Sequence, residues 1–329
     1  MRFKVKAPAN IALIKYMGKV HGSANQPENS SISMTLNNLC TTAVIEPAET
    51  ETRLFSAVTL DEKSVNKIKT HMKRLDAKLP SLMEINTHPV SLHTQNSFPA
   101  GTGIASSASS FAAITVAYSL SQARSPEKFF EKFLADDEFR SRLADLSREG
   151  SGSSCRSFFG PITEWDEKGV RALDSKLEPL IDLVVVVDSK PKTVSSSEAH
   201  ERVKTSPMWE KRKSSVTERF SRMKSAIVDG DLKTVAALSF DDAMEMHELF
   251  HTSKPGFSYM APLTHAVLDY MSMHKTPEMI ITLDAGPNVH IILPKMQALQ
   301  LRQKLASAFP MFHILDDKAG TGPTFEVMG

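Results

Sequence analysis

The feature that most constrains this chain is the stretch Phe98–Phe111, which reads FPAGTGIASSASSF. Glycines let a backbone adopt positive φ angles and approach a ligand closely, and serines ahead of an apolar-periodic run are placed to cap a helix. The apolar pattern through Phe111, Ile114, Val116 and Leu120 predicts that helix. Because the free N–H groups of a helix N-terminus suit a phosphate, the stretch predicts an anion-binding loop that opens a helix.

Five residues of this stretch are candidates for binding a nucleotide phosphate: Gly101, Gly103, Ser106, Ser107 and Ser109. The alternative is a loop that merely begins a helix, and a short glycine motif alone leaves both explanations open. The spacing is neither the G-x-x-x-x-G-K-[ST] of the P-loop nor the dinucleotide fingerprint. It resembles the phosphate loop of the GHMP kinase superfamily, the small-molecule kinases that include galactokinase, homoserine kinase and mevalonate kinase.

Length and composition indicate a soluble globular protein of about two domains, of the size of an enzyme. The chain has 329 residues, of which 41% are hydrophobic and 23% charged, with a formal net charge of +1. This balance gives no reason to expect nucleic-acid or membrane binding. Cys40 and Cys155 form no disulfide framework and no metal knuckle, so no residues are assigned to a metal. Without a signal peptide or an apolar run of transmembrane length, the sequence predicts a cytoplasmic protein.

Strand and helix patterns alternate along the chain, as in an α+β protein. Strands are predicted at 3–7, 31–36, 41–46, 161–165, 180–188, 279–284, 289–293 and 311–316. Helices are predicted at 63–79, from the serine run to 122, at 126–146, 207–228, 232–250, 264–273 and 295–308. The basic face of helix 63–79 is interpreted as solvent-exposed. Since the character changes after the strand 180–188, we place the domains at 1–188 and 189–329.

Residues 9–19, which read ANIALIKYMGK, place two lysines four residues apart. Lys15 and Lys19 lie beside Tyr16 in what reads as a turn. Lysine ammonium groups are suitable point charges for a diphosphate. Two exposed surface lysines would be the simpler explanation, and the local sequence does not exclude it.

A second loop of small residues, GSGSSCRSFFG at 150–160, contains a single arginine. Arg156 stands in a small and apolar setting, where an unpaired buried charge is costly, so it needs an anionic partner. A guanidinium group binds a carboxylate with two parallel hydrogen bonds, and Ser151 and Ser153 add hydroxyl groups nearby. The partner is either a ligand carboxylate or an acidic residue in a structural salt bridge.

Near the C-terminus, TLDAGPNVHII at 282–292 delivers Asp284 from a strand into a Gly-Pro-Asn turn. This position suits a carboxylate in a cleft, although an aspartate in a turn more often accepts a local Asx hydrogen bond.

Together these motifs resemble the mevalonate diphosphate decarboxylase family, a branch of the GHMP superfamily. The family reads ANIALIKYWGK, N-S-S-I-S-x-T-L, G-S-G-S-A-C-R-S, V-S-S-T-x-G-M and T-x-D-A-G-P-N, and all five have counterparts here in the same order. Residues 246–260 also resemble a family stretch that begins M-H. Met17 stands where the family has Trp, and His200 where it has Met.

The resemblance implies two domains, an N-terminal one like ribosomal protein S5 domain 2 and a ferredoxin-like C-terminal one. It also implies ATP-dependent decarboxylation of mevalonate 5-diphosphate, with ATP and Mg²⁺ as cofactors, in an enzyme expected to be a homodimer. The residues implied in catalysis are Asp284, Arg156, Lys15 and Ser195. The residues implied in substrate binding are Tyr16, Lys19, Ser151, Ser153, Arg156 and Ser196.

Within this resemblance Asp284 would act on the tertiary hydroxyl of the substrate and Arg156 would hold its carboxylate. Lys15, Lys19, Ser151 and Ser153 would anchor the diphosphate. Three alternatives stay open on the sequence. The chain could decarboxylate mevalonate 5-phosphate, act as a small-molecule kinase that stops after phosphorylation, or bind without turnover.

Overall fold

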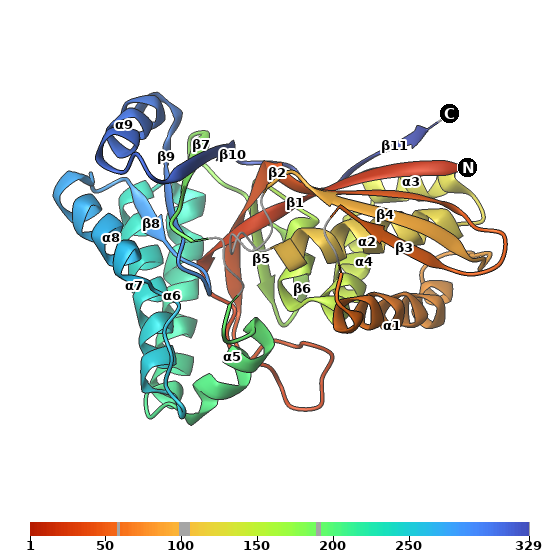
Figure 1. The fold of residues 1–329 in the computed structure, drawn as a ribbon, viewed down its shortest axis with the longest axis horizontal. Coiled ribbons are helices and arrows are strands. Elements are labelled where there is room, and N and C mark those ends of the chain that lie inside the picture. Colours follow the sequence, from red (N-terminus) through yellow and green to blue (C-terminus); the bar gives the residue numbers. More distant parts are fainter. Residues whose placement is uncertain (58–59, 99–105, 189–191, 329) are drawn as a thin grey trace.

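The computed structural model describes residues 1–57, 60–98, 106–188 and 192–328 of the chain. Its strands form two sheets and helices pack on both, which confirms the predicted α+β class. In Figure 1 the sheets lie side by side along the long axis of the molecule, the first to the right and the second to the left. We refer to each sheet with its helices as a unit.

The first sheet has seven strands and is built on one long antiparallel pair, β1 (Arg2–Ile14) with β2 (Ser31–Pro47). At one edge β11 pairs antiparallel with β1, so the two ends of the chain lie together (Figure 1). The other strands of this sheet are β3 (Arg53–Ser56), β4 (Val90–Asn96), β5 (Ile162–Asp166), β6 (Gly169–Ala172) and β11 (Thr324–Met328).

Where the sequence predicts two strands, β2 is a single strand with a bend. The carboxylate of Asp317 accepts hydrogen bonds from the backbone N–H groups of Asn37, Asn38 and Leu39 at 2.7–3.0 Å. These bonds satisfy donors that the bend would otherwise leave without partners, so the chain continues as one strand. β1 likewise continues through Pro8, where its register against β2 shifts.

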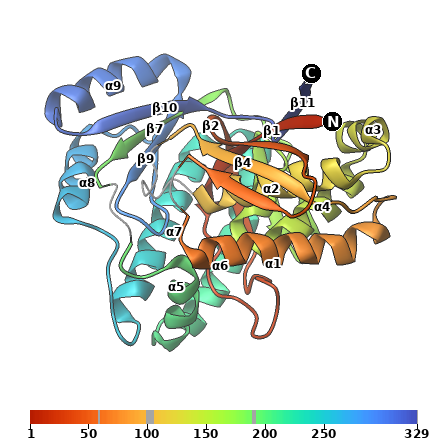
Figure 2. The ribbon, with the colours of Figure 1, turned by 45° about the vertical axis from the view of Figure 1, so that its right-hand side comes forward.

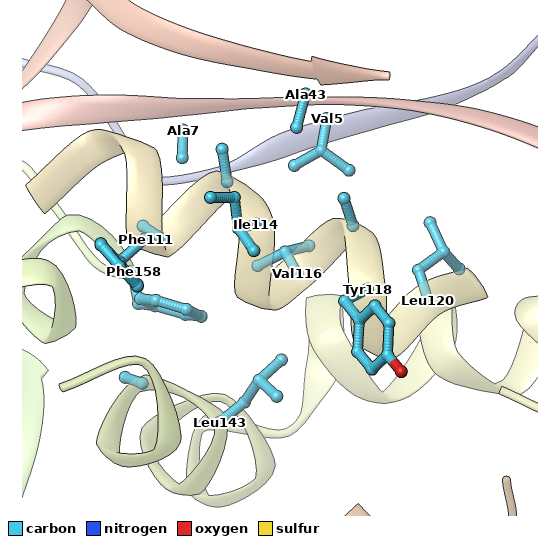
Figure 3. Packing of buried hydrophobic residues seen from close by; sticks show 14 of the residues in the cluster. Val5, Ala7, Ala43, Phe111, Ile114, Val116, Tyr118, Leu120, Leu143 and Phe158 are labelled. Atoms are coloured by element: carbon cyan, nitrogen blue, oxygen red, sulfur yellow. The ribbon is translucent and has the colours of Figure 1, made fainter. Parts of the chain in front are cut away.

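Helix α2 (Ser106–Gln122) is the central helix of the first unit. It packs between β1 and β2 on one side and η2 and α4 on the other, and nearly all of its side chains are buried. Figure 3 shows Ile114 of this helix facing strand residues such as Ala7, with Leu143 beyond the opposite side. A helix covered on both faces can be apolar all round. The predicted phosphate ligands Gly101 and Gly103 lie outside the described residues.

Three further α-helices and two short 3₁₀ helices complete the first unit. The predicted helix 63–79 is confirmed, and the segment predicted as helical from 126 to 146 is divided at Asp136, whose side chain caps the next helix through the N–H of Phe139. No helix in the described ranges is long and apolar enough to cross a membrane. These elements are α1 (Glu62–Lys78), η1 (Leu79–Ser81), α3 (Pro126–Ala135), α4 (Asp137–Gly150) and η2 (Gly152–Ser157).

The second sheet has the strand order β10-β7-β9-β8, and all of its pairs are antiparallel. Its strands are β7 (Leu180–Val186), β8 (Ile280–Thr282), β9 (Val289–Pro294) and β10 (His313–Lys318). The helices of this half of the chain are α5 (Ser196–Arg202), η3 (Val203–Thr205), α6 (Trp209–Asp229), α7 (Leu232–Thr252), α8 (Pro262–His274) and α9 (Lys295–Ala308).

The domain boundary predicted after residue 188 does not match the division between the sheets. Strand β7, predicted to close the N-terminal domain, is hydrogen-bonded to β9 and β10 of the second sheet. Strand β11, predicted to belong to the C-terminal domain, returns to the first sheet. The apolar pattern identifies β7 as a buried strand, but its partners are strands that come much later in the chain.

One hydrophobic core joins the two units. It contains Ile11 and Met34 from the first sheet, Val184 and Ile292 from the second, and side chains of α6 and α7 such as Met223. Because both sheets contribute to this core, neither unit buries its apolar surface alone. This shared core holds the two units in one relative position, and so fixes which of their surfaces face each other.

Candidate active site

A cavity of about 810 Å³ lies between the two units. Its walls come from the end of β1, helix α1, the first turn of α2, the η2 loop, the start of α5 and the turn after β8. Figure 2 shows α1 and α5 in the lower half of the molecule, and residues of both line the cavity. The predicted site residues that line it are Lys15, Tyr16, Lys19, Ser106, Ser107, Ser151, Ser153, Arg156, Ser195, Ser196 and Asp284.

Ser109 is the described exception among the predicted site residues. Its side chain is fully buried, and its hydroxyl is 2.7 Å from that of Thr41 in β2 and donates to the carbonyl of Ser106. Ser107, two positions earlier, instead faces the cavity and lies 3.1 Å from the hydroxyl of Ser151. The helical turn therefore separates the serines into one that packs against the sheet and one that faces the cavity.

At the base of the cavity Asp284 and Lys15 form an ion pair, with Nζ of Lys15 2.8 Å from Oδ1 of Asp284. The lysine is 2% exposed, and its ammonium group also donates to the carbonyl of Ala12 at 2.7 Å. Burial lowers the pKa of Lys15. Burial raises the pKa of Asp284, but the charge and the hydrogen bond of Lys15, together with smaller contributions such as that of Arg156, outweigh burial and hold that pKa below its usual value of 3.8. The Asp284 carboxylate is therefore ionised at neutral pH.

Arg156 lies in the same cavity, 3% exposed. Its guanidinium group donates to the hydroxyl of Ser31 at 3.0 Å and to the side-chain carbonyl of Asn10 at 3.4 Å, and lies over the ring of Trp165. Within the described part of the chain no carboxylate comes within ion-pair distance of it. The structural salt bridge that the sequence left open is thus absent there, and burial lowers the pKa of Arg156.

Tyr16 and the η2 loop form a further part of the cavity wall. The Tyr16 ring packs against Trp165 and His200, with ring centroids 4.9 and 4.4 Å away, and its hydroxyl donates to the carbonyl of Asn25. Gly152 allows this close packing, because a Cβ atom there would come within 2.6 Å of the tyrosine ring. Ser151 and Ser153 flank this glycine along the cavity wall.

Lys19 and the start of α5 close the other side of the cavity. Burial lowers the pKa of Lys19, whose Nζ lies 3.5 Å from the hydroxyl of Ser197. Ser195 is the N-cap of α5, where its hydroxyl accepts the N–H of Glu198 at 3.2 Å. Ser196 follows it in the first turn and lines the cavity. Ser195 therefore stabilises the start of α5, in addition to the catalytic role that the sequence predicts for it.

Sequence reasoning missed the contribution of helix α1. Its basic face, interpreted as solvent-exposed, supplies Lys63, Lys67 and Arg74 to the cavity, and burial lowers the pKa of Lys67. Lys192 faces the cavity from the segment before α5, and burial lowers its pKa as well. The helical period places these α1 residues on one face, but only the tertiary structure shows that this face meets the serine loops.

A second cavity of about 350 Å³ adjoins the first. The two share four lining residues: Ser64, Lys67, Ser106 and Ser107. The remainder of the second cavity combines apolar side chains such as Phe98 and Ile68 with polar groups of β4. A mostly apolar pocket beside a cationic and hydroxyl-rich wall suits a flat heterocycle that carries phosphates.

Comparisons with known proteins agree on one family. The family model of the diphosphomevalonate decarboxylase-like N-terminal domain matches residues 7–176, and that of the mevalonate 5-diphosphate decarboxylase C-terminal domain matches residues 182–324. The diphosphomevalonate decarboxylase of Ganoderma lucidum is 30% identical over 95% of this chain and 84% of its own length.

Solved structures show the same fold. The mevalonate diphosphate decarboxylase of Legionella pneumophila is 32% identical, with a TM-score of 0.81 over 96% of this chain and 100% of that one. A structure of MDDEF in complex with MVAPP, AMPPCP and magnesium is 25% identical, with a TM-score of 0.83 over 100% of this chain and 99% of that one. The cavity residues, the two domain matches and these relatives agree, and the chain belongs to the diphosphomevalonate decarboxylase family.

Proposed function

We propose that this protein catalyses the ATP-dependent decarboxylation of mevalonate 5-diphosphate to isopentenyl diphosphate, releasing ADP, phosphate and carbon dioxide. One observation carries the proposal most directly. The ionised Asp284 carboxylate and the buried Arg156, which lacks an acidic partner among the described residues, line the same cavity. A kinase needs the first group, whereas holding a carboxylate for its departure needs the second.

Asp284 acts on the tertiary hydroxyl of the substrate. Because Lys15 holds the pKa of this carboxyl low, Asp284 is a weak base at neutral pH. Its main contribution is to accept a hydrogen bond from the hydroxyl, direct it toward the phosphoryl group and take up its proton as the new P–O bond forms. Lys15 keeps that carboxylate ionised, so its ammonium serves the reacting end of the substrate rather than the diphosphate.

Arg156 holds the substrate carboxylate. A fork of two parallel hydrogen bonds fixes the plane of a carboxylate, and the low-dielectric setting of Arg156 strengthens both. Phosphorylation turns the tertiary hydroxyl into a leaving group, and its departure leaves an electron-poor carbon. A fixed carboxylate can then align its C–C bond with that carbon as carbon dioxide leaves.

The diphosphate end of the substrate lies between Lys19, Tyr16 and the η2 loop in this proposal. Ser151 and Ser153 supply hydroxyl groups, and Lys19 supplies a charge that burial leaves poorly solvated. Each hydrogen bond to a charged group contributes about 1.5–3 kcal/mol, so a second phosphate can raise kcat/KM by about tenfold or more. We therefore expect mevalonate 5-diphosphate to be preferred over the monophosphate.

The second cavity takes the nucleoside of ATP, and its phosphates extend along the wall shared with the first cavity. Ser106, Ser107 and Lys67 are the described residues placed to bind them. Mg²⁺ commonly binds through substrate phosphates, and we assign it there, where it would neutralise charge on the transferring group. The solved complex of MDDEF with AMPPCP and magnesium supports the use of ATP and Mg²⁺ in this family.

The test is incubation with ATP, Mg²⁺ and either mevalonate 5-diphosphate or the monophosphate, following ADP and carbon dioxide together. Equal amounts of both products, formed faster from the diphosphate, are expected. ADP with a stable phosphorylated product and no carbon dioxide would identify a kinase instead. The predicted homodimer and cytoplasmic location are separate proposals, the first of which light scattering of the purified protein can test.

A further inference from the structure

We infer that helix α7 positions the catalytic pair by holding the main chain of Lys15 with Asp242 and the main chain of Asp284 with His247. The inference rests on the role proposed for Asp284 above. Lys15 and Asp284 come from different units of the molecule, one after β1 and the other after β8. Helix α7 packs against both of these strands.

On the Lys15 side, Oδ2 of Asp242 accepts the backbone N–H of Lys15 at 2.7 Å. Asp242 is fully buried, and Arg212 and Arg219 each donate to it at 2.7 Å. The carbonyl of Lys15 is held as well, by the side-chain amide of Asn29 at 2.9 Å. Both main-chain groups of Lys15 are therefore bonded to buried or half-buried side chains, which fixes the point from which its side chain extends toward Asp284.

On the Asp284 side, Nε2 of His247 lies 3.2 Å from the backbone carbonyl of Asp284. His247 is 3% exposed, and burial lowers its pKa to about 3, so the ring is neutral. A neutral ring with its proton on Nε2 donates to that carbonyl. Nδ1 then remains a buried acceptor without a partner among the described residues. Within that part of the chain, this imidazole is thus hydrogen-bonded to the Asp284 carbonyl alone.

Asp242 and His247 stand five positions apart on helix α7. Their Cα atoms are therefore separated by about 7.5 Å along the helix axis. A helix is a stiff element, so the separation of its two contacts sets the separation of the two main chains that they hold. The 2.8 Å ion pair between Lys15 and Asp284 then forms without further adjustment. Displacing either main chain by about 1 Å would misalign Asp284 with the substrate hydroxyl, and such shifts can lower rates by about 10²-fold.

The first experiment replaces His247 by Leu and, separately, by Gln. Leucine removes the donor from a largely apolar position, while glutamine retains an N–H group of similar reach. We expect His247→Leu to lower kcat by about tenfold or more with KM for both substrates within about twofold, and His247→Gln to recover most of the loss. A folded His247→Leu enzyme with kcat near that of the unsubstituted protein would overturn the inference.

The second experiment compares Asp242→Asn with Glu245→Gln. Glu245 binds the same two arginines, Arg212 and Arg219, at 2.7 Å but does not touch Lys15. Both changes remove one negative charge from the same network. We expect only Asp242→Asn to lower kcat, whereas Glu245→Gln changes thermal stability with kcat retained. Equal losses of kcat in both variants would show that the arginine network as a whole, and not the hydrogen bond between Asp242 and Lys15, controls the rate, and would overturn the inference.

The variant Asp284→Asn separates failure of this inference from failure of the proposed function. If Asp284→Asn retains turnover, Asp284 has no role in the chemistry and there is nothing for α7 to position. If Asp284→Asn is inactive while His247→Leu and Asp242→Asn are both normal, the proposed function stands and the positioning role of α7 is wrong.

Discussion

Two buried arginines show how differently one residue type can be used in this protein. Arg212 and Arg156 are 1% and 3% exposed. Arg212 binds the carboxylates of Asp242 and Glu245, whereas Arg156 has only neutral partners such as Ser31 among the described residues. A buried charge with acidic partners holds elements together, and one without them is available to an anionic ligand.

This contrast makes a prediction about stability and activity together. Arg156→Met should lower kcat/KM by about 10- to 100-fold, the value of hydrogen bonds to a charged group, while thermal unfolding changes little. Arg212→Met leaves buried carboxylates with one cation fewer and should cost about 3–5 kcal/mol of unfolding free energy. Steady-state kinetics and thermal melts of both variants provide the test. A loss of stability in Arg156→Met as large as that in Arg212→Met would assign Arg156 to the fold.

The Lys15–Asp284 pair predicts a shift in pH dependence. A depressed carboxyl pKa gives activity that is present above that pKa and lost as the pH falls through it. In Lys15→Met the main lowering influence disappears while burial still raises the pKa of Asp284, so the acid limb of kcat should move to higher pH. Other charged or titratable groups near Asp284 are Arg156, Lys192 and the imidazole of His290.

The measurement for this prediction is kcat against pH with saturating substrates, which removes binding from the profile. Lys15→Arg is the control, because guanidinium retains the positive charge at every pH used. An acid limb that stays in place in Lys15→Met would mean that Asp284 does not control the rate.

For single residues, the sequence predicts which side chains line the cavity better than it predicts the hydrogen bonds that hold them there. Asp284, Arg156 and Tyr16 line one cavity as expected. The local sequence is enough to mark two of them as candidates, because Asp284 is a carboxylate at the end of a strand and Arg156 is an arginine among small residues. The contacts of Asp242 and His247 are different, because both residues lie inside a regular helix whose sequence gives no sign of what it touches.

At the scale of single elements, η2 packs closely against the ring of Tyr16 because its residue 152 is a glycine. The ring of Tyr16 also packs against Trp165 and His200, so it cannot move away from Gly152 without disturbing these two contacts. A methyl group on Gly152 would lie 2.6 Å from the ring carbon Cε1, well inside contact distance. The wall that carries Ser151 and Ser153 is therefore fitted to Tyr16.

We expect Gly152→Ala to cost about 1–3 kcal/mol of unfolding free energy, as overpacked positions do, and to raise KM for mevalonate 5-diphosphate more than it lowers kcat. Chemical denaturation and initial rates measure the two effects. Gly22→Ala is the control, since a methyl group there would have no described atom within 4 Å and its cost comes from a positive φ of 71° alone. Equal KM values in the two variants would contradict the fit of Tyr16 on η2.

Helices follow from the sequence more closely than strand partners do. The predicted helices 63–79 and 295–308 match the structure, because helical periodicity is a local property. The strand patterns do not reveal the short strands β3, β6 and β11, nor that β7 pairs in the second sheet. Pairing of strands depends on distant segments, which the pattern within one strand does not encode.

For the whole molecule, Asp317 joins the two sheets through a single carboxylate. It lies in β10 of the second sheet, is 3% exposed, and accepts three N–H groups at the bend of β2 in the first. This contact and the core shared by both units predict one cooperative unfolding transition rather than two.

Asp317→Asn should lower the unfolding free energy by about 1.5–3 kcal/mol, because hydrogen bonds to a charged acceptor are replaced by weaker ones. The neighbouring change Asp316→Asn is the control. The Asp316 side chain is 59% exposed and pairs with Arg302 across 3.3 Å, so its loss should cost less than about 1 kcal/mol. Calorimetry that resolves two separate transitions in the unchanged protein would contradict the shared core.

The pairing of β11 with β1 also determines when, during synthesis of the chain, the edge of β1 can be covered. Residues 324–328 supply the hydrogen-bonding partner of β1, which begins at Arg2. While the chain is being synthesised, the N-terminal strand therefore emerges long before the segment that covers its edge. Until then β1 presents a row of unpaired backbone groups to the surroundings, the kind of edge at which chains pair wrongly. That edge of β1 can therefore be covered by β11 only after all the other strands of both sheets have been synthesised.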